Sequence, residues 1–385
     1  MALRHTGDVF DRDDEALRRR DNLKWATTEA DVLPAWVADM DVEVPDVVAR
    51  RIRALVESGD LGYRDFDAPD VLLSAFEARM AARFGWSPAT GRSRAFTDVI
   101  QAFQVVVEFT TSPGDGVAIH VPSYPLFLES LTTAGRRIVP IPWGASADEL
   151  ADLWRRERVG LVIVVNPHNP SGRMLTTEEL SPIADAAAAV DLTVLSDEIH
   201  SDLALDGRRH VPFASLGPDV EDRTVTVTSA SKAFNLAGLH CAVAHVGDER
   251  VRGRLEALPF AFLGGVSSTS RVATVAAWTE GDAWLDEVVT RLRDNRDTIT
   301  DWARSVGVGV RPAEATYLAW LDFAGTPIAA DPAAAILEQA RVRLAPGTEF
   351  TAHTSIDAAS FARLNFGTGP ERLGRILDRV GSLLR

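Results

Sequence analysis

Four short polar segments carry the side chains with the most capacity for chemistry, and each follows a run of apolar, mostly β-branched residues. They are Ser123-Tyr124, Asn166-Pro-His-Asn-Pro-Ser-Gly172, Ser196-Asp197-Glu198 and Ser229-Ala-Ser-Lys232. Each segment alone has an ordinary structural explanation, because Asn-Pro forms turns, aspartate caps helices and serine-rich stretches form loops. Taken in order, they supply an aromatic ring, an amide, a carboxylate and an amine at one edge of one predicted sheet.

These four groups match what pyridoxal 5'-phosphate (PLP) chemistry requires of a protein. An amine on a short loop forms a Schiff base with the cofactor and moves protons at the substrate's Cα, and Lys232 is the candidate. A buried carboxylate keeps the pyridine nitrogen protonated, and Asp197 can fill this role. Asn169 is the candidate amide donor to the phenolate oxygen, and Tyr124 is the candidate ring that stacks on the pyridine.

Strand-like and helix-like segments alternate around these groups, which is typical of an α/β protein with a mostly parallel sheet flanked by helices. The predicted strands are Ser93–Phe96, Gly116–Val121, Arg137–Pro142, Gly160–Val165, Leu192–Ser196, Arg223–Thr228 and Cys241–Val246. The predicted helices include Asp98–Thr110, Thr177–Val190, Asp282–Val306 and Asp331–Ala340. Ligands of open α/β sheets bind beyond the carboxyl ends of the strands, where the polar segments fall.

The alternation changes after about residue 285 to one long helix, a predicted strand at Thr316–Phe323 and a final αβα-like tail. We therefore predict a large cofactor-binding domain over residues 48–285, built on the seven strands. Residues 1–47 and 286–385 are predicted to form a smaller α/β domain.

Composition excludes several classes of function. A chain of 385 residues with 46% hydrophobic residues can bury a full core, and its formal net charge of -15 argues against a nucleic-acid partner. Neither a run of eighteen apolar residues nor the apolar core of a signal peptide is present, so we expect no membrane partner and a cytoplasmic location. The single cysteine, Cys241, can form neither an intrachain disulfide nor a thiolate metal cluster, and no metal is expected.

In order and approximate spacing, the motifs resemble those of the fold-type I PLP enzymes of the class I/II aminotransferase superfamily. They are Asn166-Pro-x-Asn-Pro-x-Gly172, Asp197-Glu198, Ser229-x-Ser-Lys232-x-Phe-Asn-x-x-Gly238 and Arg363-Leu-Asn-Phe-Gly367. The resemblance extends from about Lys24 to the C-terminus. Three further segments resemble the cystathionine β-lyase branch, the cysteine-S-conjugate or C-S lyases: Lys24-Trp25 with Leu33-Pro-Ala-Trp36-Val-Ala-Asp-Met-Asp41, Ser196-Asp-Glu-Ile-His200-Ser-Asp-Leu203, and Thr316-Tyr-Leu-Ala-Trp-Leu-Asp322.

The resemblance implies a homodimer with the active site at the subunit interface and Lys232 as the internal aldimine. It implies that Arg363 pairs with the carboxylate of a small amino-acid substrate, for which a guanidinium offers two parallel hydrogen bonds. Tyr63 is then expected to reach the phosphate of the neighbouring subunit. Further residues of the implied pocket are Trp36 and Tyr317 as walls, Ala38 at the substrate, and His200, which either packs under the cofactor or faces the substrate.

The phosphate is expected at the start of the predicted helix that follows Asp98, where the resemblance implies contacts with Val99 and Ile100, and at the hydroxyl of Ser229. Two departures from the family pattern affect this end of the site. Many aminotransferases have an arginine eight positions after the lysine, where this chain has His240. Asp98 can cap the helix, and we expect it to compete with the phosphate for the same backbone amides.

The leading functional hypothesis is α,β-elimination from cystathionine or another S-substituted L-cysteine, giving a thiol, pyruvate and ammonia. The alternative is an aminotransferase on the same scaffold, because both reactions begin with removal of the Cα proton and diverge afterwards. A non-catalytic regulatory protein that retains the fold is a third hypothesis. It is disfavoured because the complete set of candidate residues is present: Lys232, Asp197, Asn169, Tyr124 and Arg363.

Overall fold

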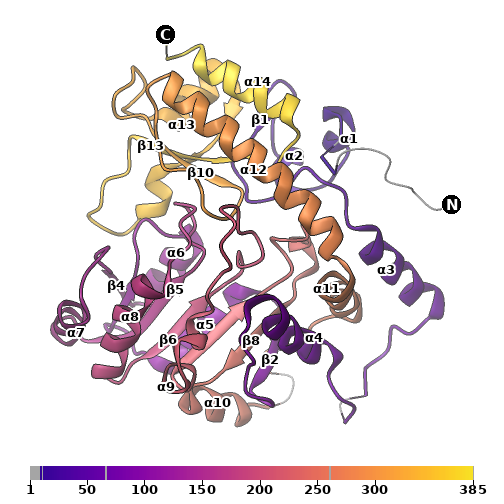
Figure 1. The fold of residues 1–385 in the computed structure, drawn as a ribbon, viewed down its shortest axis with the longest axis vertical. Helices are drawn as coiled ribbons and strands as arrows, with labels where there is room; N and C mark the ends of the chain where they lie inside the picture. Colours follow the sequence, from indigo (N-terminus) through magenta and orange to yellow (C-terminus); the bar gives the residue numbers. More distant parts are fainter. Residues whose placement is uncertain (1–8, 11, 66, 260–261, 385) are drawn as a thin grey trace.

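A computed structural model describes residues 9–10, 12–65, 67–259 and 262–384, and its centre is a seven-stranded sheet (Figure 1). The strand order is β2-β8-β7-β6-β5-β3-β4. Only β8 runs antiparallel to its neighbours, so the predicted α/β class with a mostly parallel sheet is confirmed. The strands are β2 (Ser93–Phe96), β3 (Gly116–Ile119), β4 (Arg137–Pro140), β5 (Val159–Val165), β6 (Thr193–Asp197), β7 (Thr224–Thr228) and β8 (Ala242–Val246).

Helices cover both faces of this sheet, as the nearly continuous burial of its central strands requires. One face packs against α5 (Val99–Thr110), α6 (Pro125–Thr133) and α10 (Glu249–Glu256), and there the Phe103 and Phe127 rings stack with centroids 4.3 Å apart. The other face packs against α7 (Ala147–Arg156) and α8 (Thr177–Ala189) through Trp154 and Leu180. The layers leave the carboxyl ends of the parallel strands facing the C-terminal part of the chain (Figure 1).

A second, antiparallel sheet lies over that edge, in the order β12-β13-β10-β9. It is covered by the 24-residue helix α12 and by α14, drawn in orange and yellow in Figure 1. The elements are β9 (Gly309–Val310), β10 (Leu318–Asp322), β12 (Ala345–Pro346), β13 (Phe361–Asn365), α12 (Asp282–Ser305) and α14 (Pro370–Gly381). The division at residues 285 and 286 remains a prediction, because α12 runs through it without a break.

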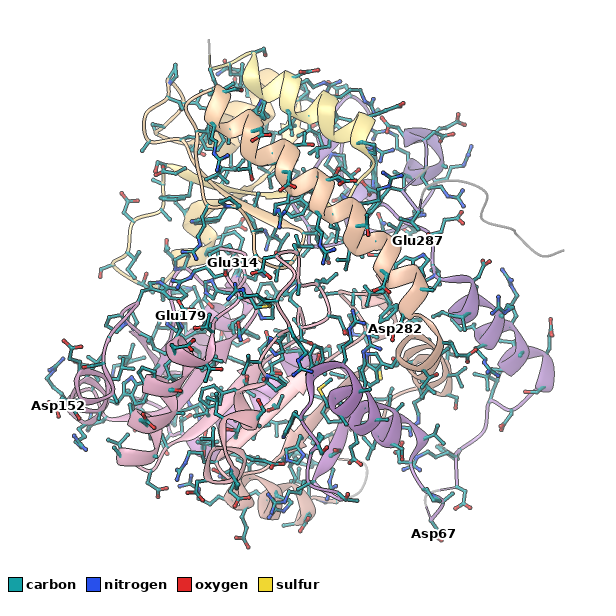
Figure 2. The ribbon with its side chains drawn as sticks, in the orientation of Figure 1. Asp67, Asp152, Glu179, Asp282, Glu287 and Glu314 are labelled. Carbon is teal, nitrogen blue, oxygen red and sulfur yellow. The ribbon has the colours of Figure 1, made fainter. Side chains whose placement is uncertain are left out.

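The N-terminal segment packs with this second sheet, as β1 (Leu33–Pro34) pairs in parallel with β11 (Val342–Arg343). The two parts of the molecule meet around Glu314, labelled in Figure 2, which accepts a hydrogen bond from the Met174 backbone at 2.8 Å. The remaining helices are α1 (Asp14–Arg18), α2 (Leu23–Ala26), α3 (Asp46–Ser58), α4 (Val71–Arg79), α9 (Pro218–Glu221), α11 (Ser268–Glu280), α13 (Pro332–Ala335) and the short turns η1 (Met80–Phe84), η2 (Phe213–Leu216), η3 (Ala237–Leu239), η4 (Ile336–Ala340) and η5 (Gly347–Thr351).

The predicted elements differ from the observed ones mainly at their ends. β3 and β4 each stop two residues before the predicted end, and both predicted runs lie next to prolines that cannot donate to a strand ladder. The predicted helix Asp331–Ala340 begins as α13 and continues as a π-helical turn, η4. Within the described ranges, no helix combines the length and apolarity needed to cross a bilayer.

Candidate active site

Lys232 lies in the turn that follows β7, and its Nζ donates a hydrogen bond to the carbonyl of Ala38, 2.9 Å away. Burial lowers the pKa of this lysine, while the carboxylates of Asp39 and Asp197 act in the opposite direction and Arg363 adds to the lowering. An amine held in this way is closer to its neutral, nucleophilic form than a lysine in water.

Asp197 is the last residue of β6 and is almost completely buried. Its Oδ1 accepts the backbone N–H of Ile199 at 3.1 Å, and within the described ranges no hydrogen bond occupies Oδ2. Burial raises the pKa of this carboxyl to about 7. The adjacent Glu198 has a structural role, because its carboxylate binds Ser196, His210 and the Phe213 backbone at 2.8–2.9 Å.

Arg363, on β13, is buried beside Asn169 in the loop after β5. Its Nη1 donates to Asn169 Oδ1 at 2.9 Å and its Nη2 to the Trp36 carbonyl at 2.7 Å, while the guanidinium lies 4.7 Å from the centre of the Phe350 ring. Burial lowers the pKa of Arg363 to about 10, and its Nε has no partner among the described residues. A buried cation with an unused donor is a binding site for a carboxylate.

The segment of residues 35–41, which we call the clamped segment, forms the wall opposite Lys232. Every carbonyl from Ala35 to Met40 accepts a hydrogen bond from a distant part of the chain. The donors are the Asn365 backbone and side chain, Arg363, Lys232, Tyr317, Lys24 and Asn235. The backbone that carries Trp36, Ala38 and Asp39 therefore has little freedom to move.

Two further predicted residues lie at the same place. His200 is buried with an unpartnered Nδ1, its ring lies edge-on to Tyr317 at 6.1 Å, and burial lowers its pKa to about 3, helped by the charges of Lys232 and Arg363. Tyr124 is the residue that precedes α6, and burial raises the pKa of its phenol. The structure thus brings Asp197, Arg363 and His200 within electrostatic range of Lys232.

The expected competition between Asp98 and a phosphate at the start of α5 stays a prediction. The Asp98 carboxylate accepts the amide of Gln101 at 2.7 Å, in the first turn of the helix, and its other oxygen lies 3.2 Å from His240 Nδ1. No hydrogen bond within the described chain occupies the amides of Val99 and Ile100. These two donors remain available at the positive end of the helix dipole.

Two other predicted phosphate ligands are placed differently. Ser229 donates its hydroxyl to the Cys241 carbonyl at 2.5 Å and contacts the Ser231 hydroxyl at 2.7 Å, so its own role is to shape the turn that holds the lysine. Tyr63 lies between α3 and α4 and is 98% exposed, so this chain does not bring it to its own site. A role for Tyr63 then depends on a second subunit.

The arrangement fits PLP. A buried carboxyl with a free oxygen, a lysine with a lowered pKa, and two free amides at a helix N-terminus are the groups that such a cofactor needs at its ring nitrogen, aldehyde and phosphate. Asn169 would hold the ring oxygen through its Nδ2, because its Oδ1 is already bound to Arg363.

Sequence reasoning missed two groups at this site, Asp39 and Asn365. Both lie inside motifs that the sequence analysis quoted, but nothing in their spacing distinguishes them from neighbouring residues. Asn365 ties the Val37 and Asp39 carbonyls to β13, and Asp39 faces Lys232. Both contacts join segments that are far apart in the sequence, so only the fold reveals them.

Comparison with known proteins gives consistent similarities. Residues 38–380 match the family described as aminotransferase class I and II. The chain is 33% identical over 373 residues to a cystathionine beta-lyase of Corynebacterium glutamicum, covering 96% of this chain and 98% of that protein. It is 33% identical to the cystathionine beta-lyase PatB of Bacillus subtilis, covering 97% and 99% of the two chains. The PLP-bound C-S lyase of Staphylococcus hominis is 27% identical and superposes with a TM-score of 0.87 over 95% of this chain and 97% of that chain.

Proposed function

The chain belongs to the aminotransferase class I and II family, and from this we propose that it is a PLP-dependent C-S lyase acting on cystathionine or another S-substituted L-cysteine. The observation that carries the proposal is the convergence of Lys232, Asp197 and Arg363 in one buried site, in a chain that is 33% identical to two cystathionine beta-lyases along nearly its full length. The products are a thiol, pyruvate and ammonia.

Arg363 orients the substrate. Its buried guanidinium binds the α-carboxylate, and Asn169 and the Trp36 carbonyl hold the guanidinium from behind. The clamped segment closes the site opposite Lys232 and excludes water from the reacting atoms. Trp36 and Ala38 contribute to this wall through their backbone, and Tyr317 fixes the Ala38 carbonyl at 2.9 Å.

Lys232 moves the proton. As a neutral amine it takes the proton from the substrate's Cα, and burial favours that neutral form by lowering the lysine's pKa. When bound, PLP delocalises the electron pair left at Cα. Asp197 would hold the ring nitrogen, Asn169 and Tyr124 the ring itself, and the amides of Val99 and Ile100 the phosphate. The C–S bond then breaks, the sulfur leaves as thiolate with the electron pair and takes up a proton, and the three-carbon fragment hydrolyses to pyruvate and ammonia.

The lyase is tested by supplying purified protein and PLP with cystathionine and several S-alkyl or S-aryl cysteines, without any oxo acid. We expect repeated turnover with equal amounts of thiol and pyruvate, because elimination needs no amino-group acceptor. Turnover that occurs only after an oxo acid is added would assign the protein as an aminotransferase instead. Lys232→Ala should abolish both turnover and the visible absorbance that borohydride removes from the wild-type protein.

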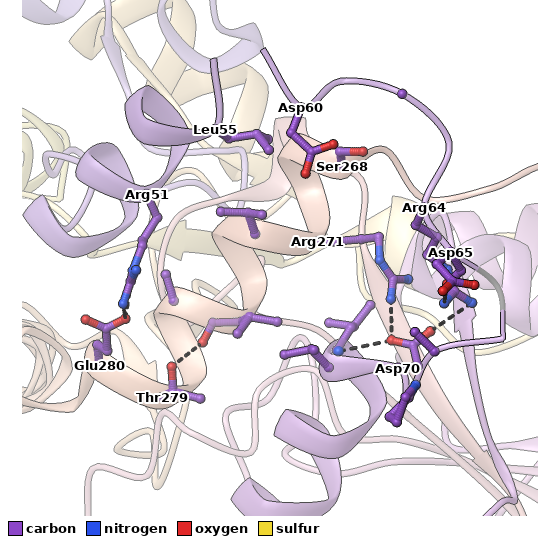
Figure 3. Close-up of a pocket in the computed structure, with 18 residues that line it drawn as sticks. Arg51, Leu55, Asp60, Arg64, Asp65, Asp70, Ser268, Arg271, Thr279 and Glu280 are labelled. Carbon is purple, nitrogen blue, oxygen red and sulfur yellow. Dashed lines mark hydrogen bonds and ion pairs between the residues drawn. The ribbon is translucent and has the colours of Figure 1, made fainter. Parts of the chain in front are cut away.

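We also propose that the protein is a homodimer in which each site receives Tyr63 from the other subunit. A cavity of about 620 Å³ opens between α3, α4 and α11 (Figure 3), and its lining includes the apolar residues Leu55, Val272 and Val275. Ion pairs flank it, Arg51 with Glu280 at one end and Arg271 with Asp70 at the other (Figure 3). The adjoining connection exposes Leu61 as well as Tyr63, and a second copy would bury both.

Light scattering of the purified protein should give twice the chain mass. Mixing two separately inactive chains, Tyr63→Ala and Lys232→Ala, tests the sharing, because a hybrid dimer rebuilds one site with an intact Lys232 and an intact Tyr63. We expect activity to reappear after refolding the mixture and to stay absent for each variant alone. A monomeric mass, or no recovery in the mixture, would reject the shared site.

The free, buried Cys241 supports the proposed cytoplasmic location.

A further inference from the structure

Asp39 is a charged neighbour of Lys232 that has no part in the mechanism proposed above. The Lys232 Nζ donates to the carbonyl of Ala38, the residue immediately before Asp39, at 2.9 Å. Hydrogen bonds hold both backbone groups of Asp39. Its amide donates to the Val37 carbonyl at 2.9 Å, and its carbonyl accepts from Lys24 Nζ at 3.1 Å. The backbone on both sides of this carboxylate is therefore held in place next to the lysine.

We propose that Asp39 is a positioning residue for the chemistry at Lys232: its carboxylate balances the positive charge on the lysine nitrogen and favours the protonated form of that nitrogen. The inference rests on the proposed attachment of the cofactor to Lys232. It assigns to Asp39 a task that Asp197 does not perform, because Asp197 is committed to the other end of the cofactor ring.

The electrostatic surroundings agree with this role. Among the charged neighbours of Lys232, Asp39 has the largest effect on the lysine's pKa and raises it, ahead of Asp197. Burial raises the pKa of Asp39 itself, and Lys232 is the first of the charges that lower it again. The other groups that face Asp39 are Lys24, Asp41 and Arg20 from the N-terminal segment and Tyr317 from the loop before β10.

Lys24 is not a competing partner for the Asp39 carboxylate. Its Nζ lies 2.9 Å from Asp41 Oδ1 and both side chains are 1% exposed, so Asp41 neutralises Lys24. No hydrogen bond or ion pair within the described residues occupies the Asp39 carboxylate. Of the two cations that remain, Lys232 acts more strongly on the Asp39 carboxylate than Arg20 does.

The experiment is a pH titration of the visible absorbance of the PLP-loaded protein, which reports the protonation of the nitrogen that links Lys232 to the cofactor. Asp39→Asn keeps the shape and removes the charge, so we expect the pKa of the linking nitrogen to fall by about 1 unit or more. The pH profile of kcat should shift with it, while KM changes little. Asp39→Glu should restore most of the titration, and Asp31→Asn, which removes an exposed carboxylate paired with Arg341, should titrate like the wild type.

An Asp39→Asn protein that titrates as the wild type does would overturn the proposal. If Asp39→Asn does not fold, as judged by circular dichroism, Asp39→Ser takes its place, because it also removes the charge. An Asp39→Ser titration that matches the wild type would then reject the role. The titration requires only that the cofactor is bound to Lys232. Its result therefore still tests the role of Asp39 if the protein proves not to be a lyase.

Discussion

At the residue scale, the site depends on charges held out of water. Arg363 and Lys232 lie in one buried space, where burial lowers the pKa of both and the charge of Arg363 lowers that of Lys232 further. Three hydrogen-bond acceptors offset the free-energy cost of burying these charged groups: Asn169 Oδ1 and the carbonyls of Trp36 and Ala38. In the proposed site, these groups are in place for a carboxylate and for an aldehyde.

The geometry of Arg363 predicts a substrate-binding defect on conservative substitution. Arg363→Lys keeps the charge but loses the planar fork, so one of the hydrogen bonds to the substrate carboxylate cannot form. We expect KM to rise about 10- to 100-fold, from the loss of about 1.5–3 kcal/mol for a hydrogen bond to a charged group. Steady-state kinetics check this. Arg254→Lys, at an exposed position of α10, is the control and should leave KM unchanged.

Buried His200 predicts the direction of one pH effect on stability. Its pKa is lowered from 6.5 to about 3 in the folded protein, so the unfolded chain binds more protons between these values. The contribution of His200 to the free energy of unfolding is therefore fully present above about pH 6.5 and is lost as the pH falls toward 3. In cofactor-free protein, His200→Gln should reduce the loss of unfolding free energy at low pH by up to about 4 kcal/mol.

Urea unfolding at several pH values measures this difference. His353→Gln, at an exposed histidine, is the matched control and should follow the wild-type slope. A His200→Gln protein with the same acid slope as the wild type would show that His200 is protonated without penalty in the folded state.

At the element scale, the loop after β5 places Asn169 beside Arg363, where the proposed site needs it. The chain turns back through Gly172, whose φ is +69°, and packs there on the strand-like residues that lead into β10. A Cβ at Gly172 would lie 2.7 Å from the Ala313 Cβ, which is a backbone-proximal atom that cannot rotate away. Both the left-handed conformation and the contact therefore require glycine.

Gly172→Ala should destabilise the protein more than an equivalent change elsewhere. The positive φ alone costs about 1 kcal/mol, and the contact with Ala313 adds to it. Gly59→Ala is the control, because its φ is +72° but no atom lies within 4 Å of the added Cβ. Both variants carry the strain of a positive φ, but only Gly172→Ala adds the contact with Ala313. The difference between their Tm values in thermal melts therefore reports the cost of that contact. Equal losses of Tm would show that the loop moves away from Ala313 at no cost.

At the scale of the whole molecule, the active site lies where three distant parts of the chain meet. The sheet edge supplies Lys232 and Asp197, the second sheet supplies Arg363, and the N-terminal segment supplies the wall. The buried pair of Lys24 and Asp41 secures that wall, and Asp41 also accepts hydrogen bonds from Trp25 and Thr368 at 2.7 Å each. Stability and site geometry are linked through this network.

Lys24→Met should therefore destabilise the molecule by about 3–5 kcal/mol, because it leaves Asp41 buried without its nearest cation. Denaturant unfolding measures the loss. The exposed pair of Arg155 and Asp152 provides the comparison, and Arg155→Met should cost less than about 1 kcal/mol. A Lys24→Met protein as stable as Arg155→Met would mean that Arg372, 3.7 Å from Asp41, neutralises the carboxylate unaided.

The sequence by itself determined the α/β class, the seven strands and the four polar segments at the sheet edge. It did so because strand burial, helix caps and Asn-Pro turns are local properties, and because parallel strands all end at one edge. Lys232 and Asp197 were accessible to this reasoning, since each directly follows or closes a strand.

Only the tertiary structure decided how the groups are paired. The cap of Asp98 on Gln101, the exposure of Tyr63 and the clamped segment were all undetermined by residue spacing. Lys232 and Ala38 are 194 residues apart, as are Arg363 and Asn169, and no periodicity connects such positions. Charge effects at this site depend on these long-range contacts and on burial, which the fold creates as a whole.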